Sequence, residues 1–247
     1  MDLGLKGRRA LVTAASKGLG RACAEALAAE GALVFIASRD PSGIAATAQE
    51  IGAAGQAVAD VSREADVQAL VEAAVKALGG LDILVVNAGG PPPGTFDSTD
   101  LPAWDVAYQL TLMSAVRLTK LALPHLKVSD QGRIVYVTSI SVRQPIPNIL
   151  LSNSLRSAVT GMAKTLSAEL APNGITVNML APDSILTDRV LSLHGGDMEE
   201  YARSLPMKRT GDPSEFGALC AFLCSKQAGY ISGQTIGIDG GSLRGVH

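Results

Sequence analysis

Short apolar runs alternate with longer segments of helical periodicity along almost the whole chain. We expect strands at 9–13, 32–38, 56–60, 81–86, 132–139 and 175–180, and helices at 18–30, 41–54, 64–78, 101–126, 150–170 and 213–224. Strands that are apolar throughout are typical of a parallel sheet covered on both faces. Because crossovers between parallel strands are right-handed, the alternation predicts an α/β fold with a doubly wound parallel sheet.

The chain is long enough for one large domain and too apolar to be disordered. It has 247 residues, of which 47% are hydrophobic and 18% are charged, and its formal net charge is −2. No linker or repeat divides it, so we expect one domain over 1–247. No basic stripe favours nucleic acid, and no apolar run approaches the roughly 20 residues that a membrane helix needs.

The first residues and the cysteines favour a cytoplasmic location. Residues 1–9 hold no apolar core of a secretion signal. The cysteines are odd in number, and Cys23, Cys220 and Cys224 lack the spacing of a metal site. We therefore expect small core thiols in a reducing compartment, and no metal.

The first expected strand runs into a turn that contains glycines. Residues 13–20 read TAASKGLG and lead directly into a helix. Glycines at such a turn allow a pyrophosphate to approach the backbone N–H groups at the helix amino terminus. The turn therefore predicts a dinucleotide site.

Further motifs follow this turn in a fixed order. They are Asp60-Val61, NAG at 87–89, Ser139 at the end of a strand, Asn178 with Pro182, and IDGG at 238–241. Together with the turn, they resemble the short-chain dehydrogenase/reductase family over essentially the whole chain, and the pattern is similar to its 3-oxoacyl carrier-protein reductase subgroup. The resemblance implies a Rossmann-type fold, a nicotinamide dinucleotide and hydride transfer to or from a carbonyl carbon.

The resemblance places the cofactor site at the ends of several strands. It assigns cofactor binding to Thr13, Ala15, Ser16, Lys17, Gly18, Leu19, Arg39, Asp60, Val61, Asn87, Ala88, Gly89, Arg156, Pro182, Asp183 and Ile185. One departure is Ala14, which replaces the first glycine of the family turn. A methyl group is tolerated there if φ stays negative.

Basic residues near the expected adenosine ribose favour NADP(H) over NAD(H). NAD-binding members of the family usually carry an acid at the end of the second strand, whereas this chain has Ser38 followed by Arg39. Lys17, just before Gly18, is the second position that is basic in NADP-preferring members. A guanidinium can bind a 2′-phosphate through two hydrogen bonds.

The catalytic tetrad of the family, which consists of Asn, Ser, Tyr and Lys, is only partly present. The sequence SAVTG at 157–161 fixes the register, because it matches the segment after the Tyr-x-x-x-Lys pair. The lysine position is then Arg156 and the tyrosine position Ser152, with Ser139 thirteen residues earlier. Counting along the preceding helix puts the asparagine position at Thr111.

These replacements change the acid–base chemistry. In the family, the tyrosine gives or takes the proton, while the lysine lowers the pKa of the tyrosine and holds the nicotinamide ribose. A phenol has a pKa of about 10, whereas the hydroxyl of Ser152 is a much weaker acid and lies one ring shorter. Arg156 is a poor proton donor, but it can hold ribose hydroxyls and stabilise a developing alkoxide.

Three interpretations remain open. The first is a working NADP(H)-dependent oxidoreductase that interconverts carbonyl and alcohol with a rebuilt tetrad. The second is a catalytically silent dinucleotide-binding sensor or scaffold. The third is an enzyme that uses another acid, with Asp183 as the leading candidate unless it caps a helix, and with Tyr108 or Tyr136 as further candidates.

The segment at about 183–209 is expected to be the substrate lid. Its leucines, Leu186, Leu191 and Leu193 among them, would form an apolar roof and favour a small apolar carbonyl or alcohol. The helices at 101–126 and 150–170 are apolar on more than one face. Family members pair these helices, so the resemblance implies a homotetramer.

Overall fold

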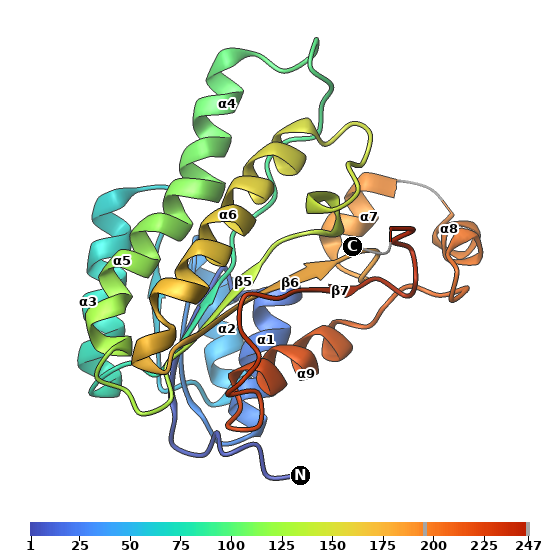
Figure 1. Cartoon of the computed structure of the whole chain (residues 1–247). Coiled ribbons are helices and arrows are strands. Elements are labelled where there is room, and N and C mark those ends of the chain that lie inside the picture. The colour runs from blue at the N-terminus through green and yellow to red at the C-terminus, as the bar shows by residue number, and fades with distance from the viewer. Residues whose placement is uncertain (195–196, 246–247) are drawn as a thin grey trace.

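Seven parallel strands form one sheet in the computed structural model of the chain, which describes residues 1–194 and 197–245 (Figure 1). The strands are β1 (Arg9–Thr13), β2 (Leu33–Ser38), β3 (Gly55–Val58), β4 (Ile83–Val86), β5 (Arg133–Val137), β6 (Thr176–Pro182) and β7 (Thr235–Ile238). Their order is β3-β2-β1-β4-β5-β6-β7, and it reverses direction between β1 and β4. This confirms the predicted doubly wound parallel sheet.

Helices cover both faces of the sheet (Figure 1). They are α1 (Gly18–Ala29), α2 (Pro41–Ile51), α3 (Glu64–Leu78), α4 (Leu101–Ala107), α5 (Ser114–Leu126), α6 (Leu150–Glu169), α7 (Asp188–His194), α8 (Met198–Ser204) and α9 (Pro213–Cys224). One buried core joins the sheet to α3, α5 and α6, through residues such as Leu70, Leu118 and Val159. The other joins it to α1, α2 and α9, through residues such as Leu27, Ile44 and Phe216.

The expected helix at 101–126 is not continuous. A π-helix, Tyr108–Met113, separates α4 from α5. The Ser114 hydroxyl donates to the Leu110 carbonyl at 2.5 Å and so satisfies an oxygen of this segment. π-Helical segments often occur at functional sites. Thr111 lies within this segment and is therefore a candidate functional residue.

Two other differences concern the edges of the fold. β7 was not among the expected strands, because its four residues are partly exposed and form no apolar run. The expected lid contains the short helices α7 and α8, while residues 195–196 of the lid lie outside the described residues. The ends of the remaining expected elements differ from the observed ones by at most three residues.

A partly buried ion pair holds the amino ends of β1 and β4 together. Arg9 Nη2 lies 2.7 Å from Asp82 Oδ1, and the Ser129 hydroxyl donates to the same oxygen at 2.6 Å. Burial alone would raise the pKa of Asp82, but these hydrogen bonds lower it to about 2. Within the described residues, we find no helix with the length and hydropathy needed to span a bilayer.

Candidate functional site

Thr13 and Asn87 fasten the cofactor turn to the end of β4. The Thr13 hydroxyl donates to the Asn87 carbonyl at 2.7 Å and accepts from the Asn87 N–H at 3.0 Å. The Asn87 side-chain amide then donates to the Ala14 carbonyl at 3.2 Å. The turn is therefore fixed where the strand order reverses, the place at which such sheets bind ligands.

The amino terminus of α1 forms a cradle that suits a phosphate. Lys17 is the N-cap residue, and its side chain makes no hydrogen bond to the helix N–H groups. A Cβ on Gly20 would lie only 2.3 Å from the Ala14 carbonyl oxygen, and Gly18 has a φ of +59°. Because uncapped N–H groups and the helix dipole attract anions, the cradle fits the pyrophosphate of a nicotinamide dinucleotide.

Ala14 adopts a conformation that favours glycine. Its φ is +49°, so the condition that φ stays negative is not met. The hydrogen bond from Asn87 to the Ala14 carbonyl helps to hold this orientation. A left-handed conformation costs a residue with a side chain about 1 kcal/mol, so the turn is strained at this position.

The other residues predicted to bind the cofactor near this turn are Ala15, Ser16, Leu19, Val61, Ala88 and Gly89. The Ala15 N–H donates to the Ala37 carbonyl at 3.0 Å, and the Thr47 hydroxyl donates to the Ser16 carbonyl at 3.0 Å. These bonds tie the turn to β2 and α2. Leu19 lies in the first turn of α1, Val61 follows β3, and Ala88 and Gly89 follow β4.

Arg39 lies between the ends of β2, β3 and β4. Its Nη1 is 3.9 Å from Asp60 Oδ2, and a Cβ on Gly89 would lie 3.8 Å from its Nη2. The structure therefore brings together three of the residues predicted to bind the cofactor. The Arg39 side chain is 62% exposed, so it is accessible to a 2′-phosphate.

Asp40, which the sequence reasoning did not consider, lies beside this end of the site. Its carboxylate caps α2 by accepting from the Gly43 N–H at 3.1 Å and from the Ser42 hydroxyl at 2.9 Å. These hydrogen bonds lower the pKa of Asp40. The order Asp, then Pro41 at the first helical position, is the sequence signal that could have identified this cap.

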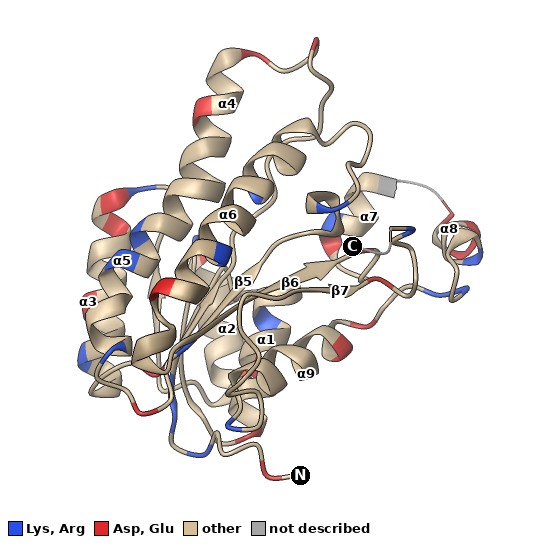
Figure 2. Ribbon diagram, in the orientation of Figure 1, with Lys and Arg blue, Asp and Glu red and all other residues tan. Residues whose placement is uncertain are grey.

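Lys17 pairs with the lid. Its Nζ lies 2.7 Å from Asp188 Oδ2 at the start of α7. Figure 2 shows both acidic and basic positions around α7. This hydrogen bond raises the pKa of Lys17 and lowers that of Asp188. Both side chains are at least 70% exposed. The ion pair thus connects the cofactor turn to the lid, which the sequence did not predict.

Ser139 lies at the end of β5 with its hydroxyl proton available. It is the N-cap residue of the 3₁₀ turn Ile140–Val142, and its Oγ accepts from the Ser141 N–H at 3.1 Å. A hydroxyl that accepts from the backbone can still donate its own proton. Ser139 can therefore donate a hydrogen bond to a substrate oxygen.

Arg156 reaches from α6 to the end of β5. Its Nη1 donates to the carbonyls of Val137 and Thr138 at 2.8 and 3.1 Å. Burial, together with the positive charge of Arg189, lowers the pKa of Arg156 to about 10. Ser152, one turn earlier on α6, is 8% exposed, and its hydroxyl forms no hydrogen bond with the described residues.

Thr111 lines a small cavity that Arg156 also lines. Its Oγ1 is buried, and no atom of the described residues hydrogen-bonds to it. The cavity of about 20 Å³ is lined by Thr111, Ser114, Tyr136 and Arg156 together with apolar side chains. A space of this size can hold one water molecule, and a water would satisfy the Thr111 hydroxyl.

The alternative acids are less well placed. Tyr136 is fully buried and shares a hydrogen bond with Thr119, and burial raises its pKa to about 12. Tyr108 is 41% exposed on the outer side of the π-helix. Asp183 follows Pro182 in the chain, and its N–H donates to the Ile238 carbonyl at 3.1 Å. Asp183 does not cap a helix, because α7 begins only at Asp188.

The lid is anchored by two further contacts. Ile185 is buried and forms a β-bridge with Gly211. The hydroxyls of Ser184 and Tyr201 lie 2.6 Å apart, which joins the start of the lid to α8. Within the ranges 1–194 and 197–245, no group of three or more His, Cys, Asp and Glu side chains could hold a metal ion.

Comparison with known proteins agrees with this geometry. A family model described as enoyl-(acyl carrier protein) reductase matches residues 13–242. Dehydrogenase/reductase SDR family member 4 of Sus scrofa is 35% identical over 246 residues, which cover 96% of this chain and 88% of that protein.

Two solved structures are also similar. L-Sorbose reductase from Gluconobacter frateurii, complexed with NADPH and L-sorbose, has a TM-score of 0.93 and 32% identity, with 100% of both chains covered. An NADPH-bound short chain oxidoreductase from Pseudomonas aeruginosa PAO1, described as containing an atypical catalytic center, has a TM-score of 0.89 and 29% identity, with 96% of both chains covered. With the matched family model and the curated relative, these likenesses show that the chain belongs to the short-chain dehydrogenase/reductase family.

Proposed function

We propose that this protein is an NADP(H)-dependent oxidoreductase that interconverts a carbonyl and an alcohol at an atypical site. The observation that carries the proposal is the position of Ser139, which has a free hydroxyl proton beside the Arg156 guanidinium at the end of β5. This pair lies at the carboxyl ends of the strands, and so does the dinucleotide cradle. A substrate oxygen held there would face hydrogen-bond donors and positive charge.

The chain's own residues position the substrate and stabilise charge. The dinucleotide supplies or accepts the hydride when it is bound. Ser139 holds the substrate oxygen through its hydroxyl proton, and Arg156 stabilises the negative charge that develops on that oxygen. Because the Ser152 side chain is one ring shorter than the family's phenol, a water held by its Oγ would give a proton to the substrate oxygen and regain one from solvent.

Thr111 takes the fourth position of the rebuilt site. Thr111, whose buried Oγ1 has no partner in the described residues, lines the same small cavity as Arg156. One water there would connect the Thr111 hydroxyl to the guanidinium. Loss of a well-matched general acid typically slows such a reaction by about 10²–10⁴-fold, so we expect a slow enzyme or one suited to activated carbonyls.

Arg39 and Lys17 support NADP(H) as the cofactor. Arg39 is exposed at the adenosine end of the cradle, and Ser38 rather than an acid ends β2. The NADPH-bound state of the two similar structures agrees with this choice. We expect Arg39→Gln to weaken NADPH binding by about tenfold, the loss of one charge-assisted contact, and to leave NADH binding unchanged.

The test combines binding with turnover. The purified protein is titrated with NADPH and NADH, and turnover is then measured with a diketone and with medium-chain alcohols plus NADP⁺. Turnover that collapses in Ser139→Ala and Arg156→Ala, and survives in the exposed control Ser157→Ala, supports the proposal.

The loss of the family's tyrosine and lysine favours a second candidate, a catalytically silent dinucleotide-binding sensor or scaffold. Tight NADPH binding without turnover in the same experiment would select this alternative.

We also propose a small, largely apolar substrate and a homotetramer. Leu186, Leu191 and Leu193 on the lid are each at least 40% exposed, so they are available to cover a ligand.

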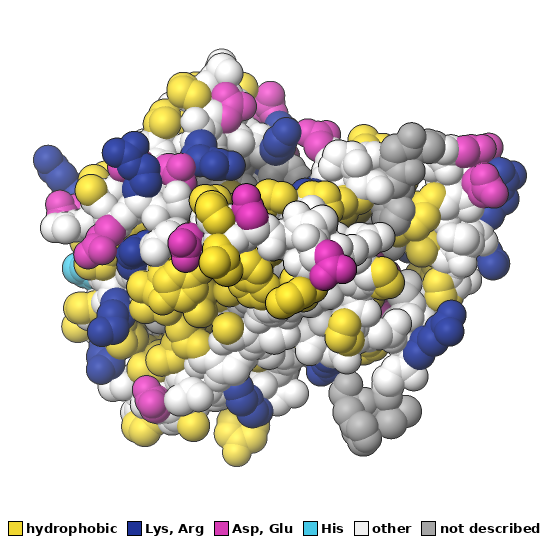
Figure 3. Space-filling model, turned by 90° about the horizontal axis from the view of Figure 1, so that it is seen from above, with side chains coloured by type: hydrophobic (Ala, Val, Ile, Leu, Met, Phe, Trp, Pro, Cys, Tyr) yellow, Lys and Arg dark blue, Asp and Glu magenta, His cyan; other side chains and the backbone are white. Residues whose placement is uncertain are grey.

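The homotetramer is supported by Phe96, Leu101 and Val106, which lie on α4 or just before it and are exposed. Figure 3 shows hydrophobic side chains gathered on the face seen from above. A second copy of the chain would cover this surface.

A further inference from the structure

Two arginines approach the ends of β4 and β5 without a carboxylate partner. Arg156 extends from α6 to the carbonyls that precede Ser139. Arg189 extends from α7 to the loop after β4, where its Nη2 donates to the Pro91 carbonyl at 2.9 Å. A Cβ on Gly90 would lie 3.1 Å from Arg189 Nε, so the guanidinium lies directly against the Gly90 backbone.

Neither guanidinium is neutralised within the described residues. No ion pair there includes Arg156 or Arg189, although other arginines such as Arg9, Arg21 and Arg209 have acidic partners. Burial lowers the pKa of both side chains, and the charge of Arg189 lowers that of Arg156 further. Partly buried cations of like charge are costly to keep together, and an anion between them would relieve that cost.

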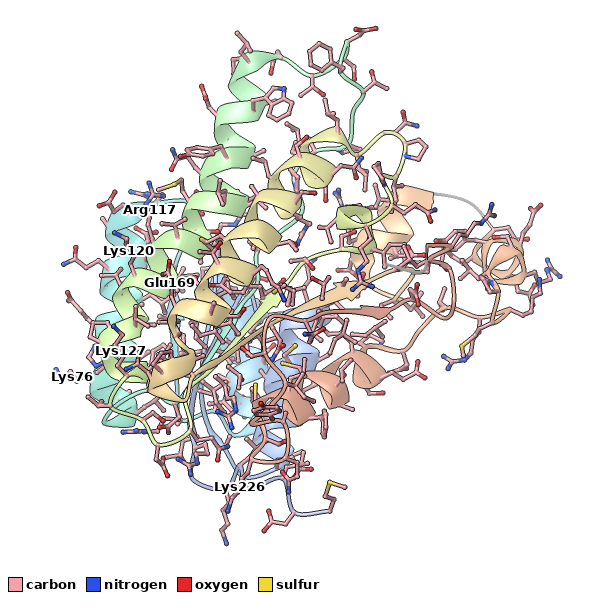
Figure 4. The ribbon with its side chains drawn as sticks, in the orientation of Figure 1. Lys76, Arg117, Lys120, Lys127, Glu169 and Lys226 are labelled. Atoms are coloured by element: carbon pink, nitrogen blue, oxygen red, sulfur yellow. The ribbon has the colours of Figure 1, made fainter. Side chains whose placement is uncertain are left out.

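The cofactor phosphates have other partners. The pyrophosphate fits the α1 cradle, and a 2′-phosphate fits Arg39 at the ends of β2 and β3. The basic side chains labelled in Figure 4, those of Lys76, Arg117, Lys120, Lys127 and Lys226, lie on other parts of the molecule from α7. Arg189 is therefore not assigned to any phosphate of the cofactor.

We propose that Arg189 binds a carboxylate of the substrate and that Arg156 adds positive charge nearby, so that the natural substrate is an oxo acid or hydroxy acid with an apolar chain. A guanidinium can hold a carboxylate through two parallel hydrogen bonds. Arg189 is on the lid helix that follows Leu186, so carboxylate and apolar chain would be held by one segment. This inference rests on the proposed function and narrows its substrate class.

The test measures binding, so it does not depend on turnover. Octanoate and its neutral counterpart octanamide are titrated calorimetrically into the NADPH-loaded protein, the Arg189→Gln variant and the Arg203→Gln variant. Arg203 lies on the same lid, is exposed and has no ion pair in the described part of the chain, so its substitution is a matched change of charge. The NADPH dissociation constant of each variant is measured in parallel.

We expect the wild type to prefer octanoate over octanamide by about tenfold or more, the value of one charged hydrogen-bonded contact. The preference should disappear in Arg189→Gln and persist in Arg203→Gln, with NADPH affinity preserved in both.

Equal binding of acid and amide by the wild type would overturn the inference. Weaker NADPH binding by Arg189→Gln with an intact octanoate preference would also overturn it, because Arg189 would then serve the cofactor. If the octanoate preference holds but NADPH is never oxidised by any 2-oxo acid or its ester, the proposed function fails and the carboxylate site stands.

Discussion

At position 14, a side chain occupies a backbone conformation that suits glycine. The φ of Ala14 is +49°, and the neighbouring Thr13 and Asn87 fix the turn through hydrogen bonds. The strain is thus stored in the loop that is proposed to bind the pyrophosphate. Strain of this kind persists only where the surrounding structure imposes it.

Ala14→Gly should therefore stabilise the protein by about 0.5–1 kcal/mol, because relief of the left-handed strain exceeds the entropy that glycine adds to the unfolded chain. The free energy of unfolding in urea measures this change. Ala15→Gly is the matched control, since Ala15 is fully buried and does not have a positive φ. The control should lower stability. A neutral or destabilising Ala14→Gly would show that the turn is not strained.

The sequence located the unusual residues but not the directions of their side chains. Counting from 157–161 identified Ser152 and Arg156, because register depends only on spacing. That Arg156 donates to Val137 and Thr138, and that Lys17 pairs with Asp188, depends on elements far apart in the chain. Such contacts are set by tertiary packing, which a local pattern does not contain.

At the scale of elements, the same limit applies to the helix expected at 101–126. Its periodicity is that of one amphipathic helix, but packing between α4, α5 and α6 accommodates the π-helix Tyr108–Met113. The apolar strands were predicted because burial on both faces leaves a clear signal. β7 left no such signal, since it is an edge strand of four partly exposed residues.

The ion pair between the cofactor turn and α7 predicts an effect on cofactor affinity. Asp188→Asn frees the Lys17 ammonium and removes a negative charge near the proposed phosphate site. We expect the NADPH dissociation constant to fall by about twofold to fivefold, as one surface charge interaction allows, and the gain to shrink at high salt. Fluorescence titration of NADPH measures it.

Glu200→Gln is the control for this variant, because Glu200 is an exposed acid on α8 of the same lid. An equal gain in Glu200→Gln would mean that only the overall charge of the lid matters. No gain in Asp188→Asn would mean that Lys17 does not approach the cofactor.

The Arg9–Asp82 pair makes the junction of β1 and β4 sensitive to acid. The pKa of Asp82 is about 2 in the folded protein, below its ordinary value of 3.8. As pH falls, the unfolded chain takes up the proton first, so the stability that this carboxylate contributes is present above about pH 4 and is lost toward pH 2. Because the Asp82 carboxylate is buried, the contribution is about 2 kcal/mol at neutral pH.

Urea unfolding at several pH values tests this window. The wild type should be more stable than Asp82→Asn at pH 6, and the difference should narrow as the pH falls below 4. Asp130→Asn is the control, since Asp130 pairs with Arg8 at the surface and is 79% exposed. A difference for Asp82→Asn that does not vary with pH would contradict the assignment.

At the scale of the whole molecule, exposed apolar side chains near α4 predict self-association. Phe96, Leu101 and Val106 are 76%, 80% and 61% exposed, and Tyr108 at the start of the π-helix is 41% exposed. They lie on α4 or directly beside it in the chain, and α4 is at the top of Figure 1. Figure 3 shows hydrophobic side chains gathered on the face seen from above. An apolar surface of this kind favours burial against a symmetry-related copy.

Val106→Lys should therefore break the assembly into smaller species, because a charge placed in an apolar interface loses its hydration without gaining a partner. Light scattering coupled to size-exclusion chromatography measures the mass of each form. Val58→Lys is the matched control, since Val58 is 58% exposed on β3, at the opposite edge of the sheet from β7. We expect a tetramer for the wild type and for Val58→Lys, and dimers or monomers for Val106→Lys. A monomeric wild type would refute the homotetramer, and a tetrameric Val106→Lys would place the interface on another face.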